Sequence, residues 1–393
     1  MAITDKEKGV WGLDQVYNKI NQGSIWEYTN AGSLYITGND PWESGGTAQP
    51  NRLIFYSSPV QIPGDWVLQD SIFASANKIN GRETNVIAMK TDGTLWAWGG
   101  NSKGELGQNN ITQYSSPVQI PGTTWNVLNI AGTNCRTTLC TKTDGTLWTW
   151  GRNEYGQMGN NNTTLYSSPV QVPGTTWKAT INDGYKSMAF KTDGTLWTWG
   201  RNQHGGLGHG DTTNESSPKQ VPGTTWGDSF GSYDDAAVVI KTDGTLWAWG
   251  NNHNGILGQN NLTQYSSPKQ IPGTTWSKVC GGIQNGACAL KTDGTLWAWG
   301  SGAYGSLGQN SRTQYSSPVQ IGSDTTWDNI TGNFYHMAGH KTDGTLWLWG
   351  SNSTGQLGLN QPTSTKYSSP VQIPGTWENT FKAGGYFTVA LKN

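Results

Sequence analysis

The sequence predicts an all-β fold: a seven-bladed β-propeller of about 50-residue repeats, preceded by a short arm that contains one helix. The first observation is self-similarity at that period, which is typical of propellers and solenoids. The second is composition, because 22 Trp and 54 Gly among 393 residues favour short strands joined by tight turns. The repeated segment KTDGTLW begins at Lys90, Lys142, Lys191, Lys241, Lys291 and Lys341.

Each repeat is expected to form four strands. The stretch after TTW and the stretch that ends in the repeated Lys, such as residues 287–290, both alternate apolar side chains. LWxWG alternates in the same way, and its two tryptophans, such as Trp96 and Trp98, are both predicted to be core residues. The fourth strand, PVQIP, suits a sheet edge because proline cannot donate to a ladder. Asp-Gly between the second and third strands predicts a type I′ hairpin turn.

The number of repeats follows from two motifs that each occur seven times. Six copies of LWxWG are intact, and residues 34–38 form a degraded seventh. We therefore expect seven blades over residues 24–393. The Trp after PVQIPG recurs at Trp66, Trp125, Trp177, Trp226, Trp276, Trp327 and Trp377, and the SSP motif begins at Ser57, Ser115, Ser167, Ser216, Ser266, Ser316 and Ser368.

Closure of the ring requires one more strand pairing. Residues 387–392 resemble the strand that normally precedes LWxWG, so they are predicted to pair with residues 34–38 and join the first and last blades. Residues 24–28 lie just before residues 34–38 in the sequence and compete for the same position.

Residues 1–23 form a separate arm without a counterpart in the repeats. Leu13, Val16, Tyr17 and Ile20 are spaced as the apolar stripe of an amphipathic helix, which ends at Gly23. Two interpretations stay open: the helix packs on its own propeller, or it docks the subunit onto a larger particle. In the second case the docking residues are Trp11, Leu13, Val16, Tyr17 and Ile20.

Composition excludes several functional classes. With 25 basic and 26 acidic residues, the chain lacks the cationic surface that a nucleic-acid partner requires. No apolar stretch is long enough to span a membrane, and the first 15 residues have no signal-peptide core. The four Cys lack zinc-site spacing and are expected to be free thiols in strands, and the five His form no ligand set. We therefore expect no catalytic activity, no cofactor and no bound metal.

The candidate binding residues lie in the connection that follows the TTW strand, because this connection differs in every repeat. Equivalent connections gather on one face of a propeller, around its central channel, and mixed aromatic and polar side chains are typical of recognition surfaces. Drift at an unconstrained loop explains the variation equally well. The candidates are Asn134, Arg136, Tyr185, Lys186, Tyr233, Asp234, Asp235, Gln284, Asn285, Phe334, Tyr335, His336 and Tyr386.

The pattern GTLWAWGxNxxGxLG, followed by SSPVQI, resembles the RCC1 repeat family over nearly all of the chain beyond residue 30. That resemblance implies a seven-bladed propeller that presents its faces to partners. The arm, KGVWGLDQVYNKINQGSIWEY, resembles the amino-terminal arms of marine bacteriophage structural proteins.

Together these resemblances favour a non-enzymatic propeller on a phage virion, in a tail fibre or other surface appendage. The arm would bind other virion proteins, and the variable face would bind a host surface protein or glycan. Such a protein is made in the host cytoplasm and then carried on the virion. The alternatives are an intracellular RCC1-like scaffold or GTPase regulator and a tectonin-like lectin.

Overall fold

The computed structural model describes residues 31–40, 54–67, 73–75, 85–131, 137–182, 184–233, 235–283, 286–333, 336–353, 356–359, 365–383 and 388–392. Within these ranges the secondary structure consists of strands, with no helix. Accordingly, no helix in the described part of the chain could cross a membrane. The predicted helix of the arm lies outside the described residues.

Six antiparallel sheets of four strands, called blades below, make up most of the structure. The first contains β3 (Phe73–Ser75), β4 (Asn85–Met89), β5 (Leu95–Gly99) and β6 (Tyr114–Gln119). The second contains β7 (Trp125–Ala131), β8 (Thr137–Lys142), β9 (Leu147–Gly151) and β10 (Tyr166–Val172). The third contains β11 (Trp177–Asn182), β12 (Lys186–Lys191), β13 (Leu196–Gly200) and β14 (Glu215–Gln220).

The remaining three blades follow the same pattern. The fourth contains β15 (Trp226–Tyr233), β16 (Ala236–Lys241), β17 (Leu246–Gly250) and β18 (Tyr265–Ile271). The fifth contains β19 (Trp276–Ile283), β20 (Gly286–Lys291), β21 (Leu296–Gly300) and β22 (Tyr315–Gln320). The sixth contains β23 (Trp327–Asn333), β24 (His336–Lys341), β25 (Leu346–Ser351) and β26 (Lys366–Ile373).

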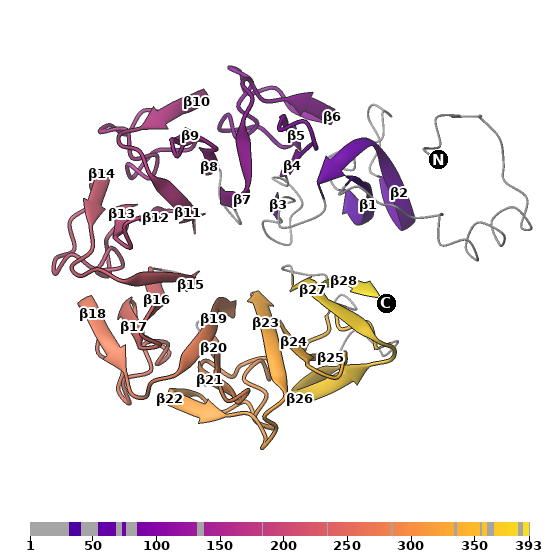
Figure 1. The fold of residues 1–393 in the computed structure, drawn as a ribbon, viewed down its shortest axis with the longest axis vertical. Coiled ribbons are helices and arrows are strands. Elements are labelled where there is room, and N and C mark those ends of the chain that lie inside the picture. Colours follow the sequence, from indigo (N-terminus) through magenta and orange to yellow (C-terminus); the bar gives the residue numbers. More distant parts are fainter. Residues whose placement is uncertain are drawn as a thin grey trace, which may run out of the picture.

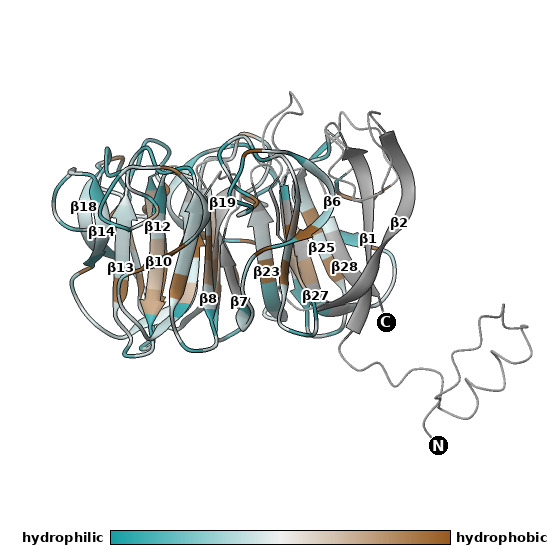
Figure 2. Cartoon of the chain, turned by 90° about the horizontal axis from the view of Figure 1, so that it is seen from above, coloured by the Kyte–Doolittle hydropathy of each residue, from teal (hydrophilic) through white to brown (hydrophobic). Residues whose placement is uncertain are grey.

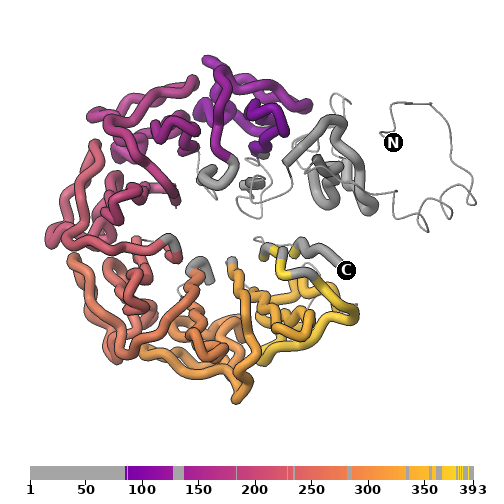
Figure 3. The backbone as a smooth tube through the Cα atoms, viewed as in Figure 1, coloured from indigo at the N-terminus to yellow at the C-terminus, as the bar shows by residue number. Residues whose placement is uncertain are grey.

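Successive blades lie side by side around a common centre, in the order of the sequence (Figures 1 and 3). In each blade the strand after TTW lies innermost and the SSP strand lies at the outer edge (Figure 1). The four-strand interpretation of the repeat and the edge position of its proline strand are therefore confirmed. The chain is an all-β propeller.

Two further sheets have two strands each: β1 (Ala31–Asp40) with β2 (Ile54–Val67), and β27 (Trp377–Ala383) with β28 (Thr388–Lys392). Leu34 of β1 lies opposite Ile62 of β2, just as Leu246 lies opposite Ile271 in the outer half of the fourth blade. The pair β1–β2 thus has the register of the outer half of a blade.

The pair β27–β28 has the register of an inner half. Trp377 lies opposite Lys392, as Trp226 lies opposite Lys241 in the fourth blade. One pair supplies the half that the other lacks, so a seventh blade formed by β28 and β1 remains our prediction. Two segments compete to close the ring. Residues 24–28 lie outside the described residues, and of residues 387–392 only residue 387 does.

The hairpin turn between the second and third strands differs from the predicted type I′. In the fourth blade, Lys241 N donates to Thr245 O at 2.8 Å and Gly244 N donates to Lys241 O at 2.9 Å. Gly244 has a φ of +77°, whereas Asp243 is not among the described residues with positive φ. The loop therefore has three residues, a type I turn followed by a left-handed glycine. The predicted hairpin between these strands is confirmed, and its predicted type I′ geometry was wrong.

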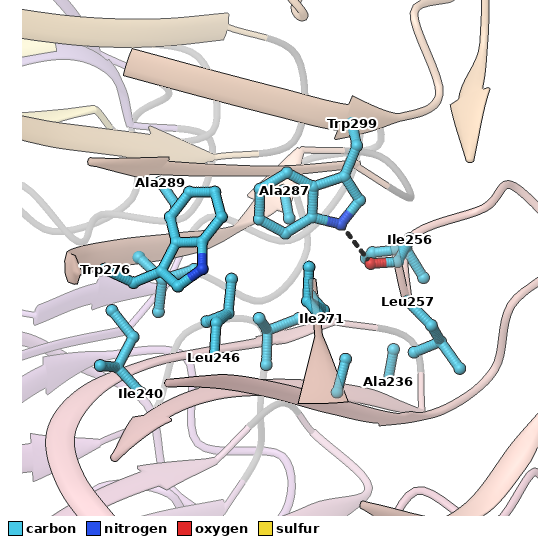
Figure 4. Close-up of a cluster of buried hydrophobic side chains, with 13 residues drawn as sticks. Ala236, Ile240, Leu246, Ile256, Leu257, Ile271, Trp276, Ala287, Ala289 and Trp299 are labelled. Carbon is cyan, nitrogen blue, oxygen red and sulfur yellow. Dashed lines mark hydrogen bonds between the residues drawn. The ribbon is translucent and has the colours of Figure 1, made fainter. Parts of the chain in front are cut away.

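The core lies between neighbouring blades rather than within one blade. Hydrophobic residues lie along the middle of the strands, and hydrophilic residues lie in the connections (Figure 2). In the cluster of Figure 4, Leu246 and Ile271 of the fourth blade pack with Trp276 and Trp299 of the fifth. Trp299 Nε1 donates to the carbonyl oxygen of Ile256 at 2.6 Å (Figure 4). A buried indole on each of five blades bonds the preceding blade in this way: Trp150 to Glu105 O, Trp199 to Gln157 O, Trp249 to Gly206 O, Trp299 to Ile256 O and Trp349 to Ser306 O.

The two Trp of LWxWG have different environments. Trp98 is fully buried, as predicted, whereas Trp96 is half-buried. Its Nε1 donates to Thr94 Oγ1 at 2.8 Å, and Lys90 Nζ lies 3.9 Å from the centre of the ring. The first Trp of the motif is thus a partly exposed residue that a lysine covers.

Candidate functional site

In each blade the four strands pair antiparallel in sequence order, so the first strand ends and the second begins at the same face as the end of the third and the start of the fourth. The inner connection joins the first and second strands, and the outer connection joins the third and fourth. In the third blade they touch, because Arg201 N donates to Tyr185 O at 2.9 Å. We call this the loop face. The opposite side, with the KTDG turns, is the turn face.

The outer connection has a fixed backbone. In the second blade, Asn153 is buried, and its Nδ2 donates to Asn162 O at 3.0 Å and to Thr164 O at 2.9 Å. A side chain at Gly156, whose φ is +78°, would come within 2.6 Å of the Ser216 backbone in the next blade. The backbone of the WGxNxxG motif is therefore held in one conformation, and this fixes the positions of the variable residues that it carries.

An arginine and tyrosine cluster occupies this face between the second and third blades. The guanidinium of Arg201 lies 4.2 Å from the centre of the Tyr185 ring, and that of Arg152 lies 5.1 Å from it. Tyr155 meets Tyr185 edge to face, with ring centres 5.7 Å apart. Cations over aromatic faces attract the ring quadrupole, so the cluster holds its four side chains in defined positions.

A buried carboxylate fixes the cluster from the fourth blade. Asp235 is 1% exposed and accepts from Arg201 through two bonds: Nη2 to Oδ2 at 2.6 Å and Nε to Oδ1 at 3.2 Å. His204 Nδ1 lies 2.9 Å from Asp235 Oδ2. Burial alone would raise the pKa of Asp235, but Lys186 and the bonds from Arg201 and His204 outweigh it and lower the pKa below its ordinary value. Asp235 is therefore ionised and positions Arg201.

The cluster extends along the outer connections. Arg152 Nη2 lies 2.6 Å from Glu154 Oε2, and Lys103 Nζ of the first blade lies 3.7 Å from Glu154 Oε1. On the other side, the His204 ring meets His253 of the fourth blade edge to face at 5.8 Å. The contacts thus cross four consecutive blades.

The residues predicted from the inner connections take different roles. Tyr185 is half-buried and lies at the centre of the cluster. Lys186 is 1% exposed, and its Nζ donates to Ala236 O at 3.0 Å. His336 is fully buried, with Nε2 2.9 Å from Thr388 Oγ1. Like Asp235, these two support the face from beneath and are not at its surface.

The other predicted residues cannot be placed. Tyr233 lies in β15, and its side chain is outside the described part of the structure. The remaining binding candidates and all five arm residues lie outside the described residues: Asn134, Arg136, Asp234, Gln284, Asn285, Phe334, Tyr335 and Tyr386, with Trp11, Leu13, Val16, Tyr17 and Ile20.

The sequence interpretation missed Arg152, Glu154, Tyr155, Arg201 and His204. All five occupy the unspecified positions of WGxNxxG, which we treated as a constant loop. The available signal was variation at those positions, because the residue after WG is Arg152 or Arg201 in two repeats but Ser301 in another.

The described residues contain no group of three or more His, Cys, Asp or Glu side chains that could hold a metal ion. Fixed aromatic and charged side chains on a repeated scaffold define a binding propeller as the class of protein.

Six segments match the family described as "Regulator of chromosome condensation (RCC1) repeat": residues 92–132, 144–180, 193–226, 243–289, 293–331 and 343–391. They cover more than half of the sequence, and the chain belongs to the RCC1 repeat family.

Individual relatives support the fold. Protein RCC2 of Homo sapiens is 33% identical over 87 residues, which are 22% of this chain and 17% of that protein. The chain therefore spans less than a fifth of this curated relative. The structure of human WBSCR16 aligns with a TM-score of 0.71 at 19% identity, covering 92% of this chain and 98% of that one. Prp20p from Saccharomyces cerevisiae aligns with a TM-score of 0.72 at 16% identity, covering 93% of both chains.

Proposed function

We propose that this protein is a non-enzymatic RCC1-type scaffold that binds a partner protein through its loop face. The observation that carries the proposal is the cluster of Arg152, Tyr155, Tyr185 and Arg201. Tyr and Arg are enriched among the residues that dominate binding energies. Because ring stacking and Asp235 already hold these side chains, binding costs little side-chain entropy.

The charge of the cluster favours an acidic partner segment. Lys103, Arg152 and Arg201 have side-chain exposures of 33%, 22% and 17%, and the exposed carboxylate that pairs with the first two is Glu154. Asp235 lies beneath Arg201 and is only 1% exposed. A segment that carries Asp or Glu would meet a net positive surface, and complementary charge raises association rates and specificity.

Two solved structures are consistent with a regulatory or scaffold role. Prp20p is described as binding Gsp1p and histones, and a second structure contains Kap60 bound to yeast RCC1 (Prp20). For this chain, these protein partners favour the intracellular scaffold or GTPase regulator over the phage appendage. The comparisons do not support a virion role, host glycans or virion partners, so these stay predictions from the sequence.

Site-specific photo-crosslinking tests the proposal. A photoreactive phenylalanine analogue replaces Tyr155 on the loop face, and the matched control places it at exposed Thr242 on the turn face. Proteins from the source cells that crosslink only at position 155 are identified by mass spectrometry, and the affinity of each is then measured with purified components.

We expect the double variant Arg152→Ala/Arg201→Ala to bind the identified partner at least about tenfold more weakly, the scale of losing one such contact. Arg312→Ala changes an exposed arginine of the fifth blade and should bind like the unaltered protein. Added salt should weaken binding. Equal crosslinking from both faces, or an affinity that the double variant leaves unchanged, would overturn the proposal.

A further inference from the structure

Two cysteines of the fifth blade lie directly opposite each other on adjacent strands. Cys280 of β19 pairs with Cys288 of β20 in the antiparallel register. Both are free thiols. Opposed residues of an antiparallel ladder have Cα atoms about 4.5–5.5 Å apart, within the range of about 4.4–6.8 Å that a disulfide spans. A bridge therefore requires little movement of the backbone.

The repeat does not require cysteine at these positions. The equivalent pairs in other blades are Ile181 with Met188, Gly231 with Val238 and Thr331 with Ala338. Different side chains therefore pack at this position in the third, fourth, fifth and sixth blades. Of these four blades, the fifth alone has a pair of thiols there.

The two thiols differ in access. Cys288 is fully buried and packs in a cluster with Trp327 and Met337 of the sixth blade. Cys280 is half-buried at the margin of the same cluster. Burial, and after it the neighbouring Cys280 thiol, raises the pKa of Cys288 well above its ordinary value. An oxidant in solution therefore reaches Cys280 first.

We propose that Cys280 and Cys288 form a redox-active dithiol, a modification site that a small-molecule disulfide such as oxidised glutathione converts to an intramolecular disulfide. Deprotonated Cys280 attacks one sulfur of glutathione disulfide, which forms a mixed disulfide and releases one glutathione thiolate. The Cys288 thiol then attacks Cys280 Sγ, passes its proton to the departing sulfur and releases the second glutathione. Two protons and two electrons leave the protein, and one glutathione disulfide becomes two glutathiones.

The bridge would join β19 to β20 across the fifth blade, so the pairing of these two strands would depend on the redox state of the surroundings. The inference does not depend on the proposed partner.

Peptide mapping gives a direct test on the full chain. Trypsin cleaves after Lys278 and Lys291, so one peptide, residues 279–291, carries both cysteines. The native protein is treated with oxidised glutathione, alkylated under denaturing conditions and digested. We expect this peptide to lose two hydrogen atoms and to resist alkylation until a reductant is added. Cys140 is the internal control, because it is fully buried opposite Ile130 and should remain alkylatable.

Two variants separate the steps. Cys288→Ala, which matches Ala338 of the sixth blade, should stop at a glutathione adduct on Cys280. Cys280→Ser should leave Cys288 reduced. Both cysteines fully alkylated after oxidant, or a stable glutathione adduct on the unaltered protein, would overturn the proposal. Circular dichroism of each variant shows that the blade has folded, so an unmodified folded protein counts against the dithiol.

Discussion

Both faces of the propeller contain contacts between a cation and an aromatic ring, but the contacts are distributed differently on the two faces. On the turn face, Lys241 Nζ lies 4.6 Å from the ring centres of both Trp226 and Trp247, and the same arrangement recurs in the second, third, fifth and sixth blades. On the loop face, Arg201 and Tyr185 form a comparable cation and ring contact, while between the fifth and sixth blades Lys366 Nζ lies 5.0 Å from the ring centre of Tyr304. Repetition around the ring indicates architecture, and we propose recognition for the contacts whose residues change from blade to blade.

The largest expected effect comes from opening the ring, because both faces depend on blades held side by side. A chain that lacks residues 387–393 loses β28, and we expect its melting temperature to fall further than with any single substitution below. A chain that lacks residues 24–28 should melt close to the full protein. The opposite result in thermal unfolding would show that residues 24–28 close the ring.

A buried tryptophan tests the shared architecture. Trp249 is fully buried and donates to Gly206 O of the preceding blade at 3.0 Å. Trp249→Ala should lower the free energy of unfolding by about 3–5 kcal/mol, the range for truncating a buried large aromatic. Trp247→Ala, at the half-buried first position, should cost less. Chemical denaturation measures both, and an equal loss would mean that the two positions are equivalent.

Acid should weaken the turn face. Asp243 Oδ1 accepts from Thr245 Oγ1 at 2.6 Å and Thr245 N at 2.9 Å, and these bonds lower the pKa of Asp243. Asp293 has the same bonds to Thr295 and a pKa lowered for the same reason. A carboxylate with a lowered folded-state pKa stabilises the protein above its unfolded pKa, and this contribution is lost as pH falls through the folded pKa.

We therefore expect the double variant Asp243→Asn/Asp293→Asn to melt below the unaltered protein at pH 7. The difference should narrow as the pH falls below about 4, near the ordinary pKa of Asp. Melting temperatures recorded from pH 7 to pH 3 give the answer. A difference that stays constant with pH would show that the turns gain nothing from ionisation.

The smallest effect on stability is expected from the arm. A chain that starts at Gly23 retains every repeat, so it should melt like the full protein. If the arm docks the subunit, the shortened chain should fail to enter the larger particle, which sedimentation of the assembled particle can measure. Normal assembly of the shortened chain would contradict docking by Leu13, Val16 and Ile20.

Sequence reasoning succeeded where local chemistry repeats and failed where neighbouring blades meet. Alternation and proline predicted all four strands of a repeat. The type of turn at Asp243 was not predicted correctly, because it depends on backbone hydrogen bonds that the amino-acid composition does not reveal. Tyr185 was chosen from its variable loop and lies in the cluster, and its role in binding stays a prediction. Lys186 and His336 turn inward because each begins the second strand of its blade. Arg201 was missed because its role depends on Asp235, 34 residues later and on another blade.

The hydrogen bond from each buried indole to a carbonyl of the preceding blade affects which substitutions the loop face can accept. The acceptor belongs to the backbone of Glu105, Gln157, Gly206, Ile256 or Ser306, so the bond places no demand on the side chain there. The scaffold tolerates five different residues at one equivalent site. Exposed loop-face residues can thus vary from blade to blade while the joints that hold the ring remain intact, whereas Gly206 cannot be exchanged in its own blade, because a Cβ there would clash with Asp235 O.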